Sequence, residues 1–198
     1  MIRTLLLVAS FAWFVRQSAQ FGDDVLAANH IVLQLISFAA FFLDAFAYVA
    51  EALVGEAAGA KDVAVFDAAV RKTTELSGVC ALGLAAVIVF AGNSLVPLIS
   101  QHASVTAAAA TSLPFAAMYV ALAFAAFQLD GIFIGTTRTR AMRNASVVSA
   151  LVFFMLSLVL MLLWQLAGLW LVFIGFVVLR AICLVWYFPA LRRSIALA

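Results

Sequence analysis

The sequence predicts an all-α polytopic membrane protein, and three observations support that fold class. Of the 198 residues, 68% are hydrophobic and only 10% are charged, with a mean hydropathy of +1.21. Soluble domains are nearer half apolar and a quarter charged. The apolar residues also gather in long runs of roughly 20 residues or more, which is the length that an α-helix needs to cross a bilayer. The net charge of only +2 argues against a nucleic-acid partner.

Six such runs predict a bundle of six transmembrane helices within a single domain, residues 1–198. They cover residues 2–20, 26–60, 73–99, 105–136, 143–165 and 168–190. In the first run, Arg3 precedes the apolar residues and Arg16 closes them, a pattern shared with cleaved signal peptides. Because no small-x-small cleavage site follows before Asp23, a first transmembrane helix is the favoured interpretation.

The second and fourth runs are longer than a perpendicular span requires, so each should tilt, bend or extend beyond the membrane. Pro114 is a candidate bend in the fourth run. Each also carries two glycines four residues apart, Gly55 with Gly59 and Gly131 with Gly135. Small residues at this spacing predict sites where two membrane helices pack closely.

The remaining runs contain few groups that call for chemistry. Cys80 in the third and Cys183 in the sixth are far apart, which suits neither a metal site nor a disulfide framework. Both are therefore interpreted as small apolar core residues. Arg180 lies inside the sixth run, where it either extends its charge to the membrane surface or pairs with a buried carboxylate. The sequence does not decide between these two roles.

The distribution of basic residues predicts the orientation in the cell inner membrane. Lysine and arginine are concentrated at the two ends of the chain and around the connections after the second and fourth runs. These residues are Arg3, Lys61, Arg71, Lys72, Arg138, Arg140, Arg143, Arg192 and Arg193. By the positive-inside rule, both termini and these two connections face the cytoplasm. The arginines near residue 140 have anionic lipid binding as a secondary interpretation.

Carboxylates inside the apolar runs are the strongest functional signal. Asp44 and Glu51 lie in the second run with Tyr48 between them. At about 100° per residue, the three fall on one helical face. A charged group at the centre of a membrane helix costs about 2.5–3.5 kcal/mol on insertion scales. The stripe should therefore face the bundle interior or a cavity, either as a proton, cation or cationic-substrate site or as a polar network that only locks helices together.

Asp130 repeats this pattern in the fourth run. Ser112, Tyr119 and Thr137 align with it on one face, while Gln128 is near in sequence but off that face. Three phenylalanines, Phe124, Phe127 and Phe133, are close enough in sequence to form an aromatic pocket for a flat organic cation, or are ordinary core side chains. The candidate pathway residues for substrate or coupling ion are thus Asp44, Tyr48, Glu51, Gln128 and Asp130. No enzyme signature such as HExxH, GxSxG or Walker A is present, so no catalytic residue and no metal site is predicted.

Two motifs in these same runs resemble a known family. Residues 43–48 (LDAFAY) with 51–52 (EA) and 55–60 (GEAAGA), and residues 129–138 (LDGIFIGTTR) with 142–144 (MRN), carry the resemblance. They are similar to the C-terminal lobe of multidrug and toxic compound extrusion (MATE) transporters, closest to the DNA-damage-inducible protein F (DinF) subgroup. Ala45 and Glu56 replace the Gly and Gln that are usual there.

The resemblance implies multidrug efflux, in which organic cations or amphipathic toxins leave the cell as H⁺ or Na⁺ enters, with no cofactor beyond the coupling ion. MATE transporters have twelve helices in two lobes, and this chain resembles one six-helix lobe. Membrane lipids and small organic substrates are the expected contacts, with an N-terminal lobe in the same longer chain or encoded separately. The alternatives are a truncated or non-transporting scaffold and a homodimeric half-size transporter.

Overall fold

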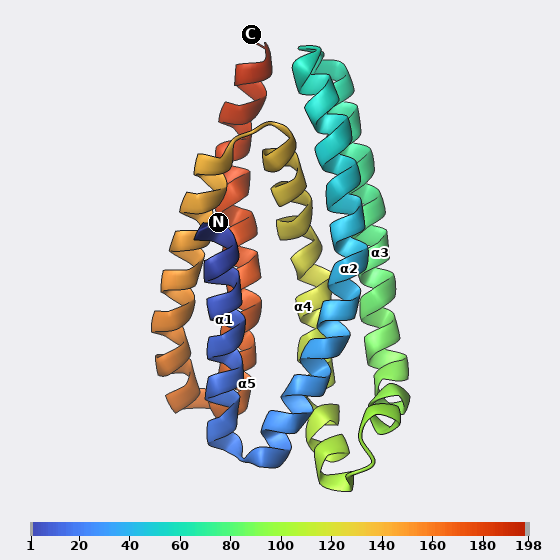
Figure 1. The fold of residues 1–198 in the computed structure, drawn as a ribbon, viewed down its shortest axis with the longest axis vertical. Helices are drawn as coiled ribbons and strands as arrows, with labels where there is room; N and C mark the ends of the chain where they lie inside the picture. The colour runs from blue at the N-terminus through green and yellow to red at the C-terminus, as the bar shows by residue number, and fades with distance from the viewer. Residues whose placement is uncertain (1, 197–198) are drawn as a thin grey trace.

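Long α-helices joined by short connections make up the computed structural model, which describes residues 2–196 (Figure 1). In chain order they are α1 (Ile2–Ser18), the single 3₁₀ turn η1 (Ala19–Phe21), α2 (Asp23–Gly59), α3 (Val63–Ile99), α4 (Ala103–Gly135) and α5 (Thr139–Ala196). Helix α5 is not straight. Its backbone reverses at Gln165, where φ is 49° and ψ is −128°, and the two arms run antiparallel.

Within residues 2–196, four helices are long and apolar enough to cross a membrane: α2, α3, α4 and α5. This agrees with a helical, polytopic membrane protein. Helix α1 has only 17 residues and is not among the four. Helix α5 is one of the four and is counted as a single helix, although its 58 residues form two antiparallel arms. The number of six membrane crossings therefore stays a prediction.

The helices differ from the predicted segments mainly at their ends. Helix α3 begins at Val63 rather than at residue 73, because the carboxylate of Asp62 accepts a hydrogen bond from the backbone N–H of Val65 at 3.0 Å and so caps the first turn. Arg71 and Lys72 consequently lie on α3 and not in a loop. Helix α5 likewise continues beyond residue 190 to Ala196.

Five chain reversals and the C-terminal end of α5 define the two ends of the bundle. The α2–α3 turn, the α4–α5 turn and the end of α5 lie toward the top of Figure 1, and η1, the α3–α4 connection and the reversal within α5 lie toward the bottom. Most of the basic residues are thus near the upper end, which is called the basic end below. Which side of a membrane this end faces is a prediction that the fold does not test.

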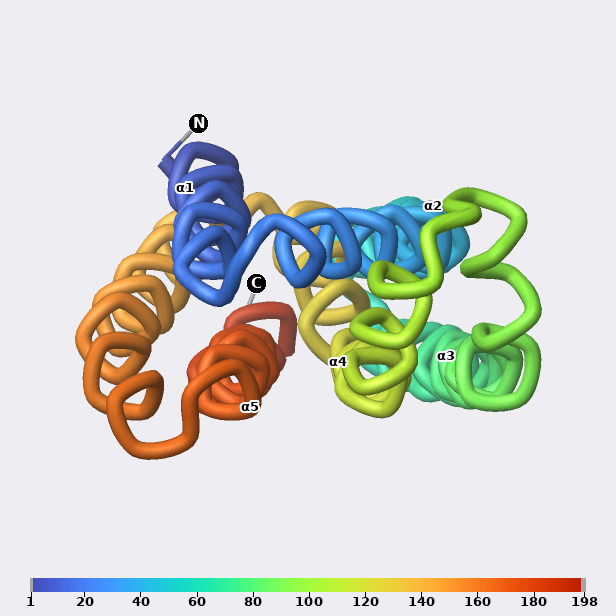
Figure 2. The backbone as a smooth tube through the Cα atoms, turned by 90° about the horizontal axis from the view of Figure 1, so that it is seen from below, coloured from blue at the N-terminus to red at the C-terminus, as the bar shows by residue number. Residues whose placement is uncertain are grey.

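Helix α4 occupies the centre and packs against α2, α3 and α5 (Figure 2). Its glycines set the contact with α2. A Cβ atom added to Gly131 would lie 2.2 Å from the carbonyl oxygen of Ala47, and one added to Gly135 would lie 2.3 Å from that of Glu51. The predicted close packing is therefore confirmed for this pair of glycines. Gly59, in contrast, has open space around it.

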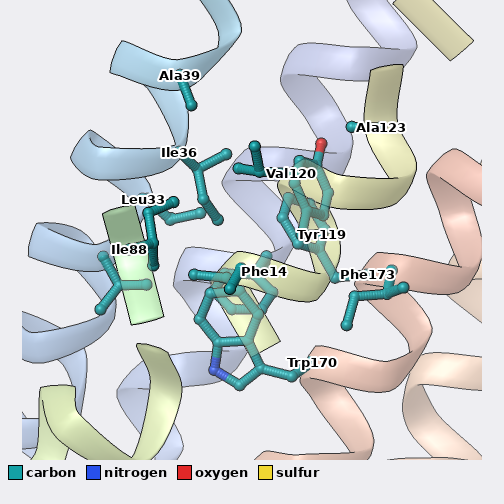
Figure 3. Close-up of a cluster of buried hydrophobic side chains, with 14 of the residues drawn as sticks. Phe14, Leu33, Ile36, Ala39, Ile88, Tyr119, Val120, Ala123, Trp170 and Phe173 are labelled. Atoms are coloured by element: carbon teal, nitrogen blue, oxygen red, sulfur yellow. The ribbon is translucent and has the colours of Figure 1, made fainter. Parts of the chain in front are cut away.

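Aromatic rings fill the core between α1, α4 and α5 (Figure 3). The ring of Phe14 meets Trp170 edge-on with centroids 4.7 Å apart, and Tyr119 stacks on Phe173 at the same centroid distance. Such pairs contribute about 0.5–1.5 kcal/mol beyond the area that they bury. This aromatic core holds α1 against α5.

A buried polar network reinforces the same region. The side-chain oxygen of Asn29 on α2 accepts hydrogen bonds from Ser112 at 3.0 Å and from the indole N–H of Trp170 at 3.3 Å. Its amide group donates to Ser18 at 3.0 Å. Asn29 thus links four helices (α1, α2, α4 and α5) and satisfies polar groups that would otherwise be costly inside the bundle.

Candidate functional site

The most deeply buried charges of the protein lie on α4 and α5. Asp130 is 6% exposed and Arg180 is 3% exposed. The Nη2 atom of Arg180 donates to the Oδ2 atom of Asp130, forming a direct ion pair between the two helices. Of the two roles open to Arg180, the structure thus shows pairing with a carboxylate.

A second arginine approaches the same oxygen. The Nη1 atom of Arg3, near the start of α1, lies 3.4 Å from Oδ2 of Asp130. The side chain of Arg3 is 32% exposed, so this contact joins the buried ion pair to the surface of the lobe. Asp130 is therefore held between two guanidinium groups. Removing one partner from a buried ion pair typically costs 3–5 kcal/mol, because a charge is left uncompensated.

The acidic residues of α2 lie beside this ion pair. Asp44 is half-buried and within electrostatic range of both Arg3 and Arg180. Arg3 also interacts electrostatically with Glu51 and Tyr48. When all of these groups are ionised, the net charge is −1, because two arginines face the three carboxylates of Asp44, Glu51 and Asp130. These five groups, the three carboxylates with Arg3 and Arg180, are called the charge cluster below.

The predicted stripe on α2 lies at the edge of the lobe and not at its centre. The residues of α2 that face the interior are apolar, and they are Leu43, Ala47, Ala50, Val54 and Ala57. Asp44 and Glu51 flank this buried face and are partly exposed, whereas Tyr48 is 68% exposed. Tyr48 therefore does not point into the interior of the bundle, which was one of the two positions expected for the stripe.

Gln128 belongs to a different part of α4. Two residues along a helix are about 200° apart, so Gln128 and Asp130 face nearly opposite directions. The buried amide of Gln128 donates to Oγ1 of Thr73 on α3. It also lines a cavity of about 270 Å³ with apolar neighbours such as Phe124 and Phe188. The structure does not bring Gln128 together with the charge cluster.

The three phenylalanines expected around Asp130 do not form one pocket. Phe124 lines the cavity beside Gln128, whereas Phe133 is fully buried and lines a separate cavity of about 620 Å³ near the α4–α5 turn. Phe127 packs against the main core. These rings are therefore distributed over core packing and two different cavities.

Two members of the charge cluster were not among the candidate residues. The sequence indicates only a topological role for Arg3 and does not decide the role of Arg180. The sequence feature that could have indicated this pairing is the presence of two arginines within apolar runs of a chain that also carries three carboxylates in such runs.

Among residues 2–196 no group of three or more His, Cys, Asp or Glu side chains is arranged to hold a metal ion. What the charge cluster can do chemically is exchange ion-pair partners when a carboxylate gains a proton or a cation.

Similarities to known proteins extend over nearly the whole chain. Residues 1–160 match the MatE family model. DNA damage-inducible protein F of Escherichia coli (strain K12) is 34% identical over 184 residues, which cover 93% of this chain and 40% of that protein. The crystal structure of the eukaryotic MATE transporter AtDTX14 has a similar fold, with a TM-score of 0.84 at 17% identity, over 94% of this chain and 44% of the transporter. The chain thus spans less than half the length of these two proteins.

Proposed function

Because this chain belongs to the MatE family, we propose that it forms one lobe of a secondary active multidrug transporter. In this proposal it exports organic cations or amphipathic toxins in exchange for H⁺ or Na⁺, as the C-terminal half of such a transporter. The family and the matching fold are those of membrane transporters and not of enzymes. Such transporters use an ion gradient and no cofactor, and the identity of the ion is part of the proposal.

The observation that carries the proposal is the charge cluster. If the buried charges served only to hold helices together, one ion pair of opposite charges would suffice, and Asp130 with Arg180 already provides it. Asp44 and Arg3 add two further charges that are partly open to the edge of the lobe. A proton or cation that neutralises Asp44 or Asp130 frees an arginine to change partner. An ion that binds differently before and after such a change shifts the equilibrium between two conformations, which is what antiport requires.

The candidate residues take different parts in this proposal. Asp44 and Asp130 bind the coupling ion or a cationic substrate, with Glu51 beside them. Tyr48, exposed on α2, contacts substrate in a cavity shared with the opposite lobe. Gln128 is the weakest of the five candidates, because it lies on another face of α4 and already bonds to Thr73.

The same proposal includes the location and the partner. We place the protein in the cell inner membrane with the basic end in the cytoplasm, since arginine and lysine collect there. An N-terminal lobe, in the same longer chain or separate, would supply the opposite wall of the cavity. A homodimer and a non-transporting scaffold are the competing arrangements.

The test is ethidium efflux from everted vesicles that contain this chain, alone or together with the N-terminal lobe of a relative. Efflux is driven by a proton gradient or by a sodium gradient, and inserted protein is quantified in each preparation. Asp130→Asn and Asp44→Asn should each abolish efflux. Asp67→Asn is the matched control, because Asp67 is exposed and pairs with Arg192 at the basic end, away from the cluster.

Each outcome separates the alternatives. Efflux by the chain alone supports a half-size transporter, and efflux only with the second lobe supports one half of a two-lobe transporter. Absence of efflux in both preparations, for several cationic dyes and both ions, would contradict transport and favour the scaffold.

A further inference from the structure

A cavity of about 530 Å³ lies between the start of α1 and the α4–α5 turn. Three arginines line it, Arg3 from α1 with Arg140 and Arg143 from α5. None of the described residues that line it is acidic. The concentration of positive charge is thus high, although the cavity belongs to a protein with a net charge of only +2. This cavity is called the arginine cavity.

We propose that the arginine cavity binds the phosphate group of an anionic phospholipid. Guanidinium groups match phosphate oxygens with paired N–H donors and bind them more strongly than neutral donors do. Apolar side chains, among them Ile134 and Met142, complete the lining and suit the glycerol and upper acyl region of a lipid. Basic pockets between membrane helices at a cytoplasmic surface are typical sites for such headgroups.

The start of α5 adds to the positive potential. Thr139 and Arg140 are its first two residues, and both line the cavity. The first N–H groups of a helix have no partner within the helix and carry partial positive charge. Arg143 is oriented by hydrogen bonds from its Nε and Nη2 atoms to the side-chain oxygen of Asn144, at 3.3 and 3.1 Å.

A neighbouring cavity indicates which headgroup fits best. The cavity of about 620 Å³ at the α4–α5 turn shares Thr139 and Arg140 with the arginine cavity and adds Arg138 and Asn144. The shared residues make the two cavities adjoining parts of one basic surface. A headgroup with two phosphates, as in cardiolipin, can place one in each cavity, whereas phosphatidylglycerol can occupy only one.

Arg3 connects the lipid site to the charge cluster. It lines the arginine cavity and at the same time lies 3.4 Å from Asp130. A bound phosphate competes with Asp130 for this guanidinium. Lipid binding therefore weakens one of the two contacts that hold the Asp130 carboxylate, while the contact with Arg180 stays. The lipid site itself does not depend on the proposed transport.

The experiment measures lipid binding to the purified protein in mild detergent, by native mass spectrometry and by the shift in thermal unfolding. Cardiolipin, phosphatidylglycerol and phosphatidylcholine are added separately, and sodium phosphate and pyrophosphate serve as headgroup-free anions. The test variant is Arg140→Gln with Arg143→Gln. The control, Arg71→Gln with Lys72→Gln, removes the same charge from exposed positions on α3.

Cardiolipin should bind more tightly than phosphatidylglycerol, and phosphatidylcholine should not shift unfolding. The test variant should lose about 25-fold in cardiolipin affinity, since each basic residue near an anionic lipid contributes about fivefold, and the control should lose far less. Equal losses in the two variants, or none in either, would overturn the proposal. Binding of pyrophosphate as tight as that of cardiolipin would replace the lipid by a soluble anion. Arg140→Lys with Arg143→Lys, which keeps the charge, should retain part of the affinity and show that the side chains are not required for folding.

Discussion

Replacing Arg180 by methionine should destabilise the protein severely, because it leaves Asp130 inside the bundle without its closest partner. Asp130 is 6% exposed, and among residues 2–196 Arg3, at 3.4 Å, is the one other cation that pairs with its carboxylate. Breaking a buried ion pair by removing one member costs about 3–5 kcal/mol. Since Arg3 stays in place and is partly solvated, we expect the lower end of that range, about 3 kcal/mol.

The compensating variant distinguishes an ion pair from simple loss of packing. Asp130→Asn in the Arg180→Met background removes the uncompensated charge, so the double variant should regain about half or more of the lost stability. The free energy of unfolding is measured by denaturant titration in detergent micelles for both single variants and the double variant. A double-mutant cycle isolates the coupling between the two side chains, which should be about 2 kcal/mol or more.

The exposed pair of Arg192 and Asp67 provides the comparison. Their side chains are 49% and 42% exposed, although Nη2 of Arg192 lies 2.6 Å from Oδ2 of Asp67. Exposed ion pairs contribute little, because water and salt screen them. Additive effects of the two changes at Asp130 and Arg180, or a coupling no larger than that of the exposed pair, would refute the reasoning.

Two further variants test the packing around the site, and a third tests the role of Gln128. Gly131→Ala should lower the unfolding temperature, because its Cβ would lie 2.2 Å from an α2 carbonyl oxygen; an effect equal to that of the control Gly59→Ala would contradict this contact. Asn29→Ala should cost about 1–3 kcal/mol in denaturant titration, since buried groups on three helices lose their partner; an unchanged midpoint would show that water replaces the amide. Gln128→Met should leave ethidium efflux intact because Gln128 bonds to Thr73 away from the cluster, and loss of efflux with normal insertion would instead support a role for Gln128 in the pathway.

The sequence predicted the helical architecture well, because apolar runs and their charged boundaries directly reflect the cost of placing polar groups in a bilayer. It also predicted the contact at Gly131 and Gly135, since few residues other than glycine allow helices to approach so closely. The start of α3 was missed because residues 63–72 are amphipathic and charged, although Asp62 is a recognisable cap. The spacing of apolar residues does not indicate that the helix extends over these ten residues.

The sequence could not predict which residues of the charge cluster form ion pairs. Asp130 and Arg180 are 50 residues apart and lie on different helices. Their contact depends on how α4 and the second arm of α5 are rotated and on the height at which α5 reverses at Gln165. The position of Arg3 depends on the depth at which α1 begins. Rotation and depth follow from packing between helices, and no local pattern encodes them.

The backbone contact between α2 and α4 also determines which parts of the lobe can move independently. At Gly131 and Gly135 the two helices touch through main-chain atoms, which have no alternative rotamers and leave no slack for sliding. We therefore expect the parts of α2 and α4 that carry Asp44, Glu51 and Asp130 to move together, with a fixed spacing between the two helices. Arg3, by contrast, reaches the cluster on a flexible side chain from α1. A conformational change that begins at these carboxylates should therefore move Arg3 and Arg180 together with α1 and α5, the helices that carry them. Helices α2 and α4 should keep their positions relative to each other.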